Sequence, residues 1–144
     1  MSIEETKAIV RRYLAGGRQN WEAVVDLDRM RVVDTPGMPD TDDWEILLAH
    51  GESDNPREFF ENLSGGVQDI IAEGNKVVVR WTMNGTAKKP FKHPLLYVTI
   101  PVGTTIARRG ISIFTLDAGM VIEERTYEDR LGVLEQLGLA PTAP

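Results

Sequence analysis

The sequence has no cysteine, which excludes disulfide bonds, thiolate metal sites and a cysteine nucleophile. It also has no apolar run near the roughly 18 residues that a membrane-spanning helix needs. The first residues, MSIEETKAIV, carry acids where a signal peptide carries positive charge ahead of an apolar run. These absences predict a cytoplasmic protein that does not enter a membrane.

Positive charge is scarce, since 16 Lys and Arg side chains stand against 22 Asp and Glu, for a formal net charge of −6. No stripe of Lys and Arg is available to bind nucleic acid. The sequence also lacks a Gly-rich phosphate loop, a Gly-x-Ser-x-Gly motif and a dinucleotide-binding fingerprint. We therefore expect neither a nucleic-acid partner nor a cofactor.

Histidine is rare as well. His50 and His93 lie far apart, without a glutamate at the spacing of metal ligands, so we predict no metal site. His93 lies between Lys92 and Pro94 in a polar stretch and is expected at the surface. His50 follows an amphipathic stretch and is a candidate for the mouth of a cavity.

The composition is that of an ordinary globular protein, with 42% apolar and 26% charged residues. A chain of 144 residues can bury a substantial core within one domain. No internal repeat or low-complexity segment divides it, so we expect residues 1–144 to form a single domain.

The last quarter of the chain predicts a hairpin that leads into a short helix. Residues 111–116 and 120–127 are rich in β-branched and aromatic side chains, which favour strands. Between them, the Asp-Ala-Gly sequence at 117–119 predicts a turn whose glycine adopts a positive φ. From Asp129 the apolar period becomes helical, and Gly138 suits the left-handed residue that follows a helix.

The first half predicts three helices. Ser2 and Glu5 form a capping box that begins the first helix. Asn20 is placed to cap the second. An Asn-Pro pair at 55–56 predicts the start of a third helix, which a Gly-Gly pair at 65–66 would end.

The middle of the chain has the pattern of strands. We expect strands over residues 67–73 and 76–86, and two more over 95–102 and 104–116 after a polar connection at 88–94. Helices, then a meander of long antiparallel strands, then a helix predict an α+β fold. The expected architecture is a cone-shaped roll, with a curved antiparallel sheet wrapped around the N-terminal helices and a short C-terminal helix.

Half of the sequence resembles the SnoaL-like polyketide cyclases, which belong to the superfamily with the cone-shaped fold of nuclear transport factor 2. Four stretches carry the likeness in order: IIAEGNKVVVRWTMNGT, RRGISIF, DAGMVIEE and DRLGVLEQLGL. Ala87 departs from the family pattern where many members have a histidine, and Arg125 where they commonly have a tryptophan. The resemblance implies the cone fold and a homodimer of sheets paired face to face. It leaves the function open, since the superfamily includes cyclases, isomerases, epoxide hydrolases and binding proteins.

By this resemblance, Asp129 matches the family aspartate that acts as acid/base. A carboxylate in an apolar cavity suits proton transfer next to a carbonyl, because desolvation raises its pKa. An aspartate between a strand and a helix is also an ordinary N-cap, and the two roles are compatible. Arg125 and Tyr127 share its strand face by the period of two. They are candidates to pair with Asp129 and to donate to a substrate oxygen, and the alternative is an exposed or dimer-facing strand side.

Arg80 and Trp81 are consecutive on a predicted strand and so point to opposite faces. Arg80 is a candidate to line the cavity or to reach Glu124 across the sheet, and a structural ion pair is its alternative. Limonene-type epoxide hydrolases of the superfamily have an Arg-x-Asp on the corresponding strand and a second aspartate on the last strand. Here Thr82 and Thr126 stand at those two places, so that water-activating arrangement is broken.

Large aromatic and apolar side chains predict an apolar internal pocket. In a cone fold the core side chains also form the cavity wall, and the polar atoms of Tyr and Trp can orient a ligand. The candidate substrate-binding residues are Tyr13, Trp44, His50, Phe59, Trp81, Met83 and Glu124. The sequence leaves open whether residues 123, 125 and 127 or residues 122, 124 and 126 of the last strand face the pocket.

The leading hypothesis is a cofactor-independent cyclase or isomerase. It would close a ring by an aldol-type step, or carry out a related rearrangement, on a hydrophobic polyketide- or terpenoid-like carbonyl compound. Asp129 would be the acid/base, and negative charge would be stabilised by Arg80, Arg125 or Tyr127. The alternative is a module of the same fold that binds a small hydrophobic molecule or serves as a scaffold. Epoxide or ester hydrolysis comes third, and would need another acid such as Asp34 or Asp40.

Overall fold

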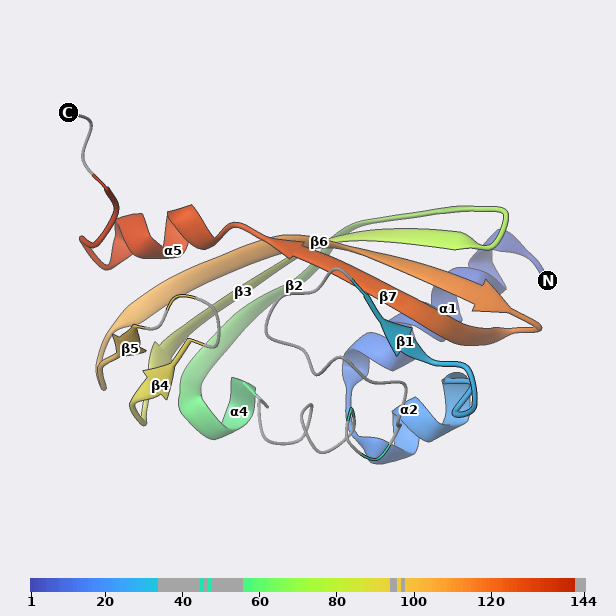
Figure 1. Cartoon of the computed structure of the whole chain (residues 1–144), viewed down its shortest axis with the longest axis horizontal. Helices are drawn as coiled ribbons and strands as arrows, with labels where there is room; N and C mark the ends of the chain where they lie inside the picture. Colours follow the sequence, from blue (N-terminus) through green and yellow to red (C-terminus); the bar gives the residue numbers. More distant parts are fainter. Residues whose placement is uncertain (34–44, 46, 48–55, 94–95, 97, 142–144) are drawn as a thin grey trace.

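The computed structural model describes residues 1–33, 45, 47, 56–93, 96 and 98–141. The chain begins with helix α1, Ile3–Ala15 (Figure 1). The Ser2 hydroxyl accepts a hydrogen bond of 3.1 Å from the Glu5 N–H, so the predicted helix start is confirmed. Gly16 follows α1 with a φ of +76°, a conformation that suits glycine at a helix end.

Helix α2, Arg18–Val24, follows almost at once. The prediction that Asn20 caps this helix is wrong. Asn20 lies inside α2, and its side-chain amide donates to the carbonyl of Gly16. Gly17 occupies the cap position instead, and the chain then reaches strand β1, Arg31–Val32.

A curved sheet of five strands forms the wall of the molecule (Figure 1). The strand order is β1-β7-β6-β3-β2, with β1 parallel to β7 and the other neighbours antiparallel. The long strands are β2 (Phe60–Glu73), β3 (Lys76–Ala87), β6 (Thr105–Asp117) and β7 (Met120–Glu128). Helices α1 and α2 lie within the concavity of the sheet, and the C-terminal helix lies beyond its far end. The predicted α+β cone-shaped roll is therefore confirmed.

Strand β2 replaces most of the predicted third helix. Only one turn, α4 (Pro56–Phe59), is helical, and β2 begins directly after it. Gly65 does not end a helix: a Cβ added there would lie 2.6 Å from the carbonyl oxygen of Thr82 on β3. The two strands thus approach too closely for a side chain at this point. Pairing with β3 stabilises the extended form over the helix that the local sequence favours.

A small two-stranded sheet pairs β4 (Phe91–Lys92) with β5 (Thr99–Ile100). The expected polar connection at 88–94 therefore contains a strand. The expected strand at 95–102 is shorter in the part that is described, while Leu95 and Tyr97 lie outside the described residues. This hairpin folds under the end of the main sheet (Figure 1).

His93 is buried, so the expected surface position is wrong. Its side chain is 0% exposed, and its ring centroid lies 6.3 Å from that of Phe91. Successive residues of an extended chain alternate between two sides, so Phe91 and His93 share the buried side while Lys92 points to solvent.

The predicted C-terminal hairpin and helix are confirmed. Strands β6 and β7 are joined by a turn in which Gly119 has a φ of +77°. Helix α5, Arg130–Gln136, follows β7, and Gly138 comes after it with a φ of +71°. No helix in the described ranges has the length and apolar character of a membrane span.

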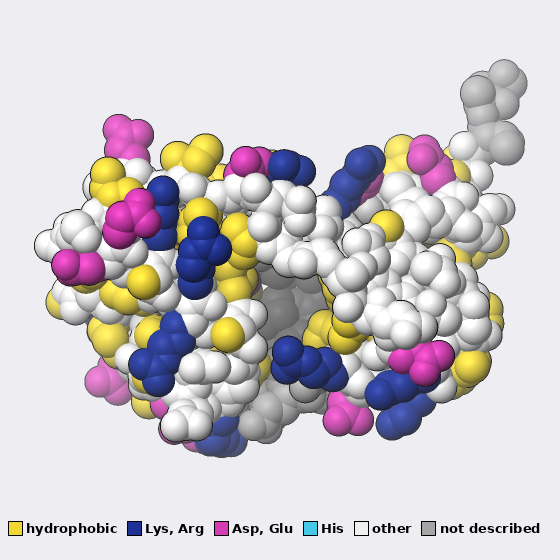
Figure 2. All heavy atoms as spheres, turned by 180° about the vertical axis from the view of Figure 1, so that it is seen from behind, with side chains coloured by type: hydrophobic (Ala, Val, Ile, Leu, Met, Phe, Trp, Pro, Cys, Tyr) yellow, Lys and Arg dark blue, Asp and Glu magenta, His cyan; other side chains and the backbone are white. Residues whose placement is uncertain are grey.

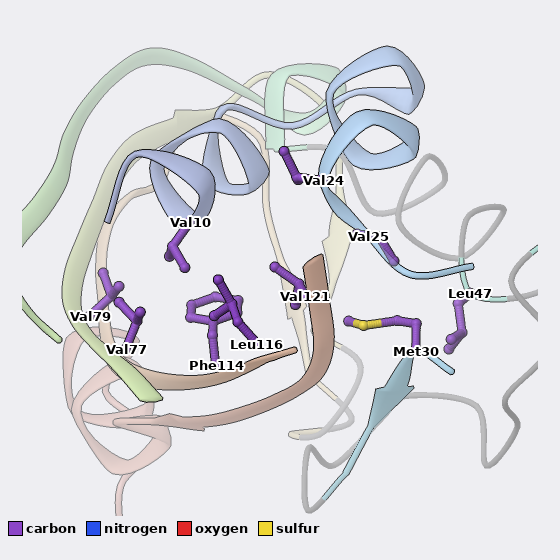
Figure 3. Packing of buried hydrophobic residues seen from close by; sticks show 10 residues of the cluster. All are labelled: Val10, Val24, Val25, Met30, Leu47, Val77, Val79, Phe114, Leu116 and Val121. Atoms are coloured by element: carbon purple, nitrogen blue, oxygen red, sulfur yellow. The ribbon is translucent and has the colours of Figure 1, made fainter. Parts of the chain in front are cut away.

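The core lies between the helices and the concave side of the sheet (Figure 3). Val10 of α1 points toward Val77, Val79 and Phe114 of strands β3 and β6, and all four side chains are fully buried. Burying an aliphatic or aromatic side chain contributes about 1.5–3 kcal/mol. We call the side of the sheet that carries Val79 and Phe114 the inner face and the opposite side the outer face. Every second residue of each regular strand belongs to the inner face.

Candidate active site

Tyr13 and Glu124 meet on the inner face of the sheet. Glu124 of β7 pairs directly with Phe114 of β6, whose ring lies in the core, so the two side chains share that face. Tyr13 Oη donates a hydrogen bond of 2.6 Å to Glu124 Oε2. Residues 124 and 126 of the last strand therefore point inward, which decides between the two sets that the sequence left open.

Glu124 is one end of a hydrogen-bonded series of side chains that crosses three strands. Thr126 Oγ1 on β7 donates to Glu124 Oε1 over 3.3 Å. Ser112 Oγ on β6 lies 2.8 Å from Thr126 Oγ1, and Trp81 Nε1 on β3 donates to Ser112 Oγ over 3.0 Å. We call Tyr13, Trp81, Ser112, Glu124 and Thr126 the inner polar network.

Aromatic side chains surround the Tyr13 end of the inner polar network. The Tyr13 ring centroid lies 5.2 Å from that of Phe114 and 6.4 Å from that of Trp21. Within the network only Ser112 is buried, and the other four residues are partly exposed. Polar groups beside accessible apolar surface are typical of sites that bind small hydrophobic molecules.

The molecular surface is hollowed on one side. Figure 2 shows the opening from behind, between the half that contains α1 and α2 and the half that contains β4, β5 and α5. Hydrophobic side chains lie along this opening, and Lys and Arg side chains stand at its edge. An apolar molecule approaching this side would meet a mixed border of apolar and positively charged groups.

Burial raises the pKa of the Glu124 carboxyl above its ordinary value, because a charge is poorly solvated inside the protein. The hydroxyls of Tyr13 and Thr126 act in the opposite direction. Burial and the neighbouring carboxylate raise the pKa of Tyr13 well above its ordinary value, so Tyr13 remains a hydrogen-bond donor. A carboxyl with a raised pKa holds an accepted proton more readily, which suits a general acid/base.

Asp129 lies at the start of α5, outside the inner polar network. Its Oδ1 accepts a bond of 2.9 Å from the Gly132 N–H, and its Oδ2 accepts one of 2.9 Å from Arg109 Nε. The Gly132 N–H and then Arg109 lower the pKa of Asp129, and its side chain is 33% exposed. Asp129 thus caps α5, as considered from the sequence, and its acid/base role stays a prediction.

Arg80 lies on the outer face, opposite to Trp81, as the alternation of the strand predicts. Its Nε donates a bond of 2.6 Å to Asp69 on β2, and both side chains are more than half exposed. These surroundings match the structural ion pair that was the alternative for Arg80. The structure does not bring Arg80 to Glu124.

Arg125 and Tyr127 also lie on the outer face, where they pair with Ile113 and Ile111 of β6. Arg125 Nε donates a bond of 3.1 Å to Glu123, and Tyr127 is 54% exposed. Their surroundings therefore match the alternative expected from the sequence, an exposed side of the strand. Their catalytic roles stay predictions.

The candidate substrate-binding residues divide into three groups. Those that the structure brings together in the inner polar network are Tyr13, Trp81 and Glu124. Phe59 and Met83 instead pack against a second buried cluster, formed by Phe60, Ala87, Phe91, Ile100 and Ile106. Trp44 and His50 lie outside the described residues. Among the residues that are described, no three His, Asp or Glu side chains are placed to share a metal ion.

A buried charged cluster at the end of the sheet was missed from the sequence. Glu128 accepts bonds of 2.6 and 2.8 Å from Arg108 Nε and Nη2, and His93 Nε2 lies 3.6 Å from Glu128 Oε1. Burial by itself would raise the pKa of Glu128, but Arg108 and His93 lower it to about 2. The cluster holds the β4–β5 hairpin against the main sheet. Side chains alternate along a strand, so Glu128 shares one face with residues 124 and 126. This alternation was the feature of the sequence that could have indicated a buried Glu128.

A family model described as SnoaL-like polyketide cyclase matches residues 7–137. The match spans the N-terminal helices as well as the sheet, and includes both Tyr13 and Glu124. No curated protein matches the sequence.

Solved structures share the fold. The chain is similar to a candidate SnoaL-like polyketide cyclase from Jannaschia sp. CCS1, with 25% identity, a TM-score of 0.74, and coverage of 99% of this chain and 98% of that one. It is similar to TsrD from Streptomyces laurentii, with 23% identity, a TM-score of 0.73, and coverage of 96% and 98%. An NTF2-like protein from Burkholderia thailandensis E264 has 13% identity, a TM-score of 0.61, and coverage of 92% and 96%.

Proposed function

The chain belongs to the SnoaL-like polyketide cyclase family, and we propose that it is a cofactor-independent cyclase or isomerase that acts on a hydrophobic carbonyl compound. The observation that carries the proposal is the Glu124 carboxyl on the inner face, hydrogen-bonded to Tyr13, in a residue that is partly exposed. A partly buried carboxyl with a raised pKa and a phenol at hydrogen-bond distance provide a base and a proton donor.

In the proposed reaction, Glu124 removes a proton from the carbon next to a carbonyl group. The electron pair of that C–H bond forms a carbon–carbon bond to a second carbonyl carbon of the same molecule, and the π electrons of this carbonyl move to its oxygen. Once Glu124 carries the proton, the Tyr13 hydroxyl, which donates to Glu124 in the structure, turns its hydrogen to the oxyanion and stabilises it. Glu124 then returns the proton to the oxyanion, which gives a ring with a hydroxyl group and an unchanged protein.

The surroundings of Glu124 support a hydrophobic substrate. The rings of Phe114 and Trp21 lie 5.2 and 6.4 Å from the ring of Tyr13, whose hydroxyl bonds to the carboxyl. Apolar surface with few polar groups binds carbon-rich molecules and uses the polar groups to orient them. Compounds with several carbonyl groups on an apolar skeleton, such as polyketides and terpenoids, fit this description.

The test is turnover of a panel of polyketide- and terpenoid-like carbonyl compounds, followed by chromatography and NMR. We expect Glu124→Gln to lower turnover by about 10²- to 10⁴-fold, the usual contribution of a general acid/base. Glu123→Gln is the matched control, because Glu123 is the neighbouring acid on the outer face, bonded to Arg125. The control should retain wild-type turnover.

Asp129 is the second candidate for the acid/base, because it matches the family aspartate by position. Asp129→Asn in the same assay separates the two residues. If Asp129→Asn abolishes turnover while Glu124→Gln does not, the acid/base role belongs to Asp129 and the assignment to Glu124 is wrong. If both variants are as fast as the wild-type protein, the catalytic proposal is wrong.

The alternative function is binding without catalysis. Ala87, which stands where many family members have a histidine, is buried in the second cluster and offers no polar group. A binding module would bind compounds of the same panel at a fixed stoichiometry of compound to protein and would not convert them. Epoxide or ester hydrolysis stays third, since Asp34 and Asp40 lie outside the described residues.

A further inference from the structure

A series of hydrogen bonds leads from Trp81 to Glu124, and the proton transfer proposed above makes no use of it. Trp81 Nε1 bonds Ser112 Oγ, Ser112 Oγ bonds Thr126 Oγ1, and Thr126 Oγ1 bonds Glu124 Oε1, over 3.0, 2.8 and 3.3 Å. Neighbouring strands β3, β6 and β7 supply these side chains, and Ser112 in the middle is only 3% exposed. Strand pairing therefore holds the series in place.

Trp81 and Glu124, at the two ends, together determine the direction of these bonds. An indole N–H can only donate, so Ser112 Oγ is the acceptor at that end. An ionised carboxylate can only accept, so the single hydrogen of the Thr126 hydroxyl is donated to Glu124, and the Ser112 hydroxyl is therefore the donor to Thr126. All hydrogens of the series thus point toward the carboxyl group.

This direction suits a carboxylate that accepts a proton. Ionised Glu124 receives one donor at each oxygen, Thr126 at Oε1 and Tyr13 at Oε2, and bonds to the charged form stabilise it. A proton on Glu124 cannot pass along the series to its end, because the Trp81 indole cannot accept a hydrogen bond. A proton taken from a substrate would therefore not leave Glu124 along this series.

We infer that Trp81, Ser112 and Thr126 are positioning residues, which favour the ionised form of Glu124 and orient its carboxyl group for proton exchange with the substrate. The part of this inference that concerns proton exchange with the substrate rests on the proposed function. The part that concerns the ionised form of Glu124 does not. Burial raises the pKa of Glu124, so donors that act against burial are needed if the group is to serve as a base.

The test is an NMR titration of protein labelled with ¹³C at the glutamate carboxyl groups, with Glu124→Gln used to identify the Glu124 signal. Thr126→Val removes the hydroxyl that contacts the carboxyl group, and Trp81→Phe removes the donor at the far end while keeping a ring. We expect Thr126→Val to raise the pKa of Glu124 by roughly one unit. Trp81→Phe should raise it by a smaller amount, although two side chains separate Trp81 from Glu124.

Thr86→Val is the matched control. The Thr86 hydroxyl lies 2.8 Å from that of Thr105 and is not part of the series, so this variant should leave the titration unchanged. Ser112→Ala provides a third measurement of the same effect if another variant does not fold. The inference is overturned if folded Trp81→Phe and Thr126→Val proteins titrate as the wild type does, or if Thr86→Val shifts the pKa as much as Thr126→Val.

The pH dependence of turnover separates this inference from the proposed function. The rising limb of the profile should move to higher pH in Thr126→Val by the shift that NMR measures. If Glu124→Gln keeps wild-type turnover, the assignment of the acid/base role to Glu124 is wrong while the NMR result still stands. If the NMR pKa shifts and the profile does not, the positioning role in catalysis is overturned.

Discussion

Tyr13 in the first helix donates a hydrogen bond of 2.6 Å to Glu124 in the last long strand, across 111 positions of sequence. The helix therefore supplies a polar contact of the candidate site as well as the apolar cover of the sheet. Any change that moves α1 relative to β7 alters both the core and the state of the carboxyl group. This coupling can be measured through stability.

Tyr13→Phe tests the coupling through its pH dependence. Burial raises the folded-state pKa of Glu124, so its contribution to stability is present below the unfolded pKa and is lost as pH rises through the folded pKa. Without the Tyr13 hydroxyl this pKa rises further. We expect the free energy of unfolding of the variant to fall by about 0.5–1.5 kcal/mol in acid, where the Glu124 carboxyl is neutral. At alkaline pH, where the carboxyl is charged, we expect a fall of about 1.5–3 kcal/mol. Urea unfolding across this range measures the difference.

The control is the same Tyr13→Phe substitution made in a protein that already carries Glu124→Gln. Glutamine still offers a carbonyl oxygen to Tyr13 but does not titrate. Adding Tyr13→Phe to Glu124→Gln should therefore give a loss that does not change with pH. An equal pH dependence in both backgrounds would contradict the coupling between Tyr13 and Glu124.

Glu128→Gln should remove an acid-labile part of the stability. The folded-state pKa of Glu128 is lowered from 4.5 to about 2 by Arg108 and His93 against the effect of burial. Its contribution is thus present above the unfolded pKa and is lost as pH falls through about 2, with a size of about 3 kcal/mol. We expect the wild-type protein and the variant to differ most at neutral pH and to converge in acid. Glu73→Gln, at an exposed position of the same sheet, is the control, and a difference that is constant with pH would be the contrary result.

Asp129→Ala tests the cap of α5. The Asp129 Oδ1 accepts the Gly132 N–H, and alanine cannot replace this bond, whereas asparagine can. We expect a decrease of a few degrees in melting temperature for the alanine variant and a smaller change for Asp129→Asn. Circular dichroism during heating measures both. Equal melting temperatures for all three proteins would show that the cap is dispensable, and the asparagine variant would then still serve the activity assay.

Ile111→Lys tests the homodimer expected from the family resemblance, which we propose forms through the outer face. The exposed apolar side chains there include Ile71 (64%), Ile111 (45%) and Tyr127 (54%), and the last two pair directly. A lysine in the centre of this surface should turn a dimer into a monomer in sedimentation velocity. Leu139→Lys, at an exposed position beyond α5, is the control and should stay dimeric. A monomeric wild-type protein at all concentrations would refute the proposal.

Local sequence chemistry predicted the features that depend on neighbouring residues. The Ser2 cap, the turn at Gly119 and the left-handed Gly138 occur as expected, because each is decided within a few residues of backbone. The order of helices and long strands followed from the hydrophobic period for the same reason. These elements were sufficient for the fold class.

The errors lie where distant strands decide the local structure. An Asn-Pro start and a Gly-Gly end favoured a helix after residue 55, yet pairing with β3 extends the chain from Phe60 onward. His93 was expected at the surface because its neighbours are polar, but Arg108 and Glu128 on other strands give it a buried position. Neither partner can be read from the sequence around His93.

The sequence by itself determined that Glu124 and Arg125 point to opposite sides of one strand, because side chains alternate along an extended chain. Tertiary structure alone decided which side became the interior. Helix α1 packs on the side of Phe114, so Glu124 meets Tyr13 there and Arg125 is left on the outer face. Alternation within a strand carries no information about which face a helix will cover, and that choice is made by the contacts that bury the most apolar surface.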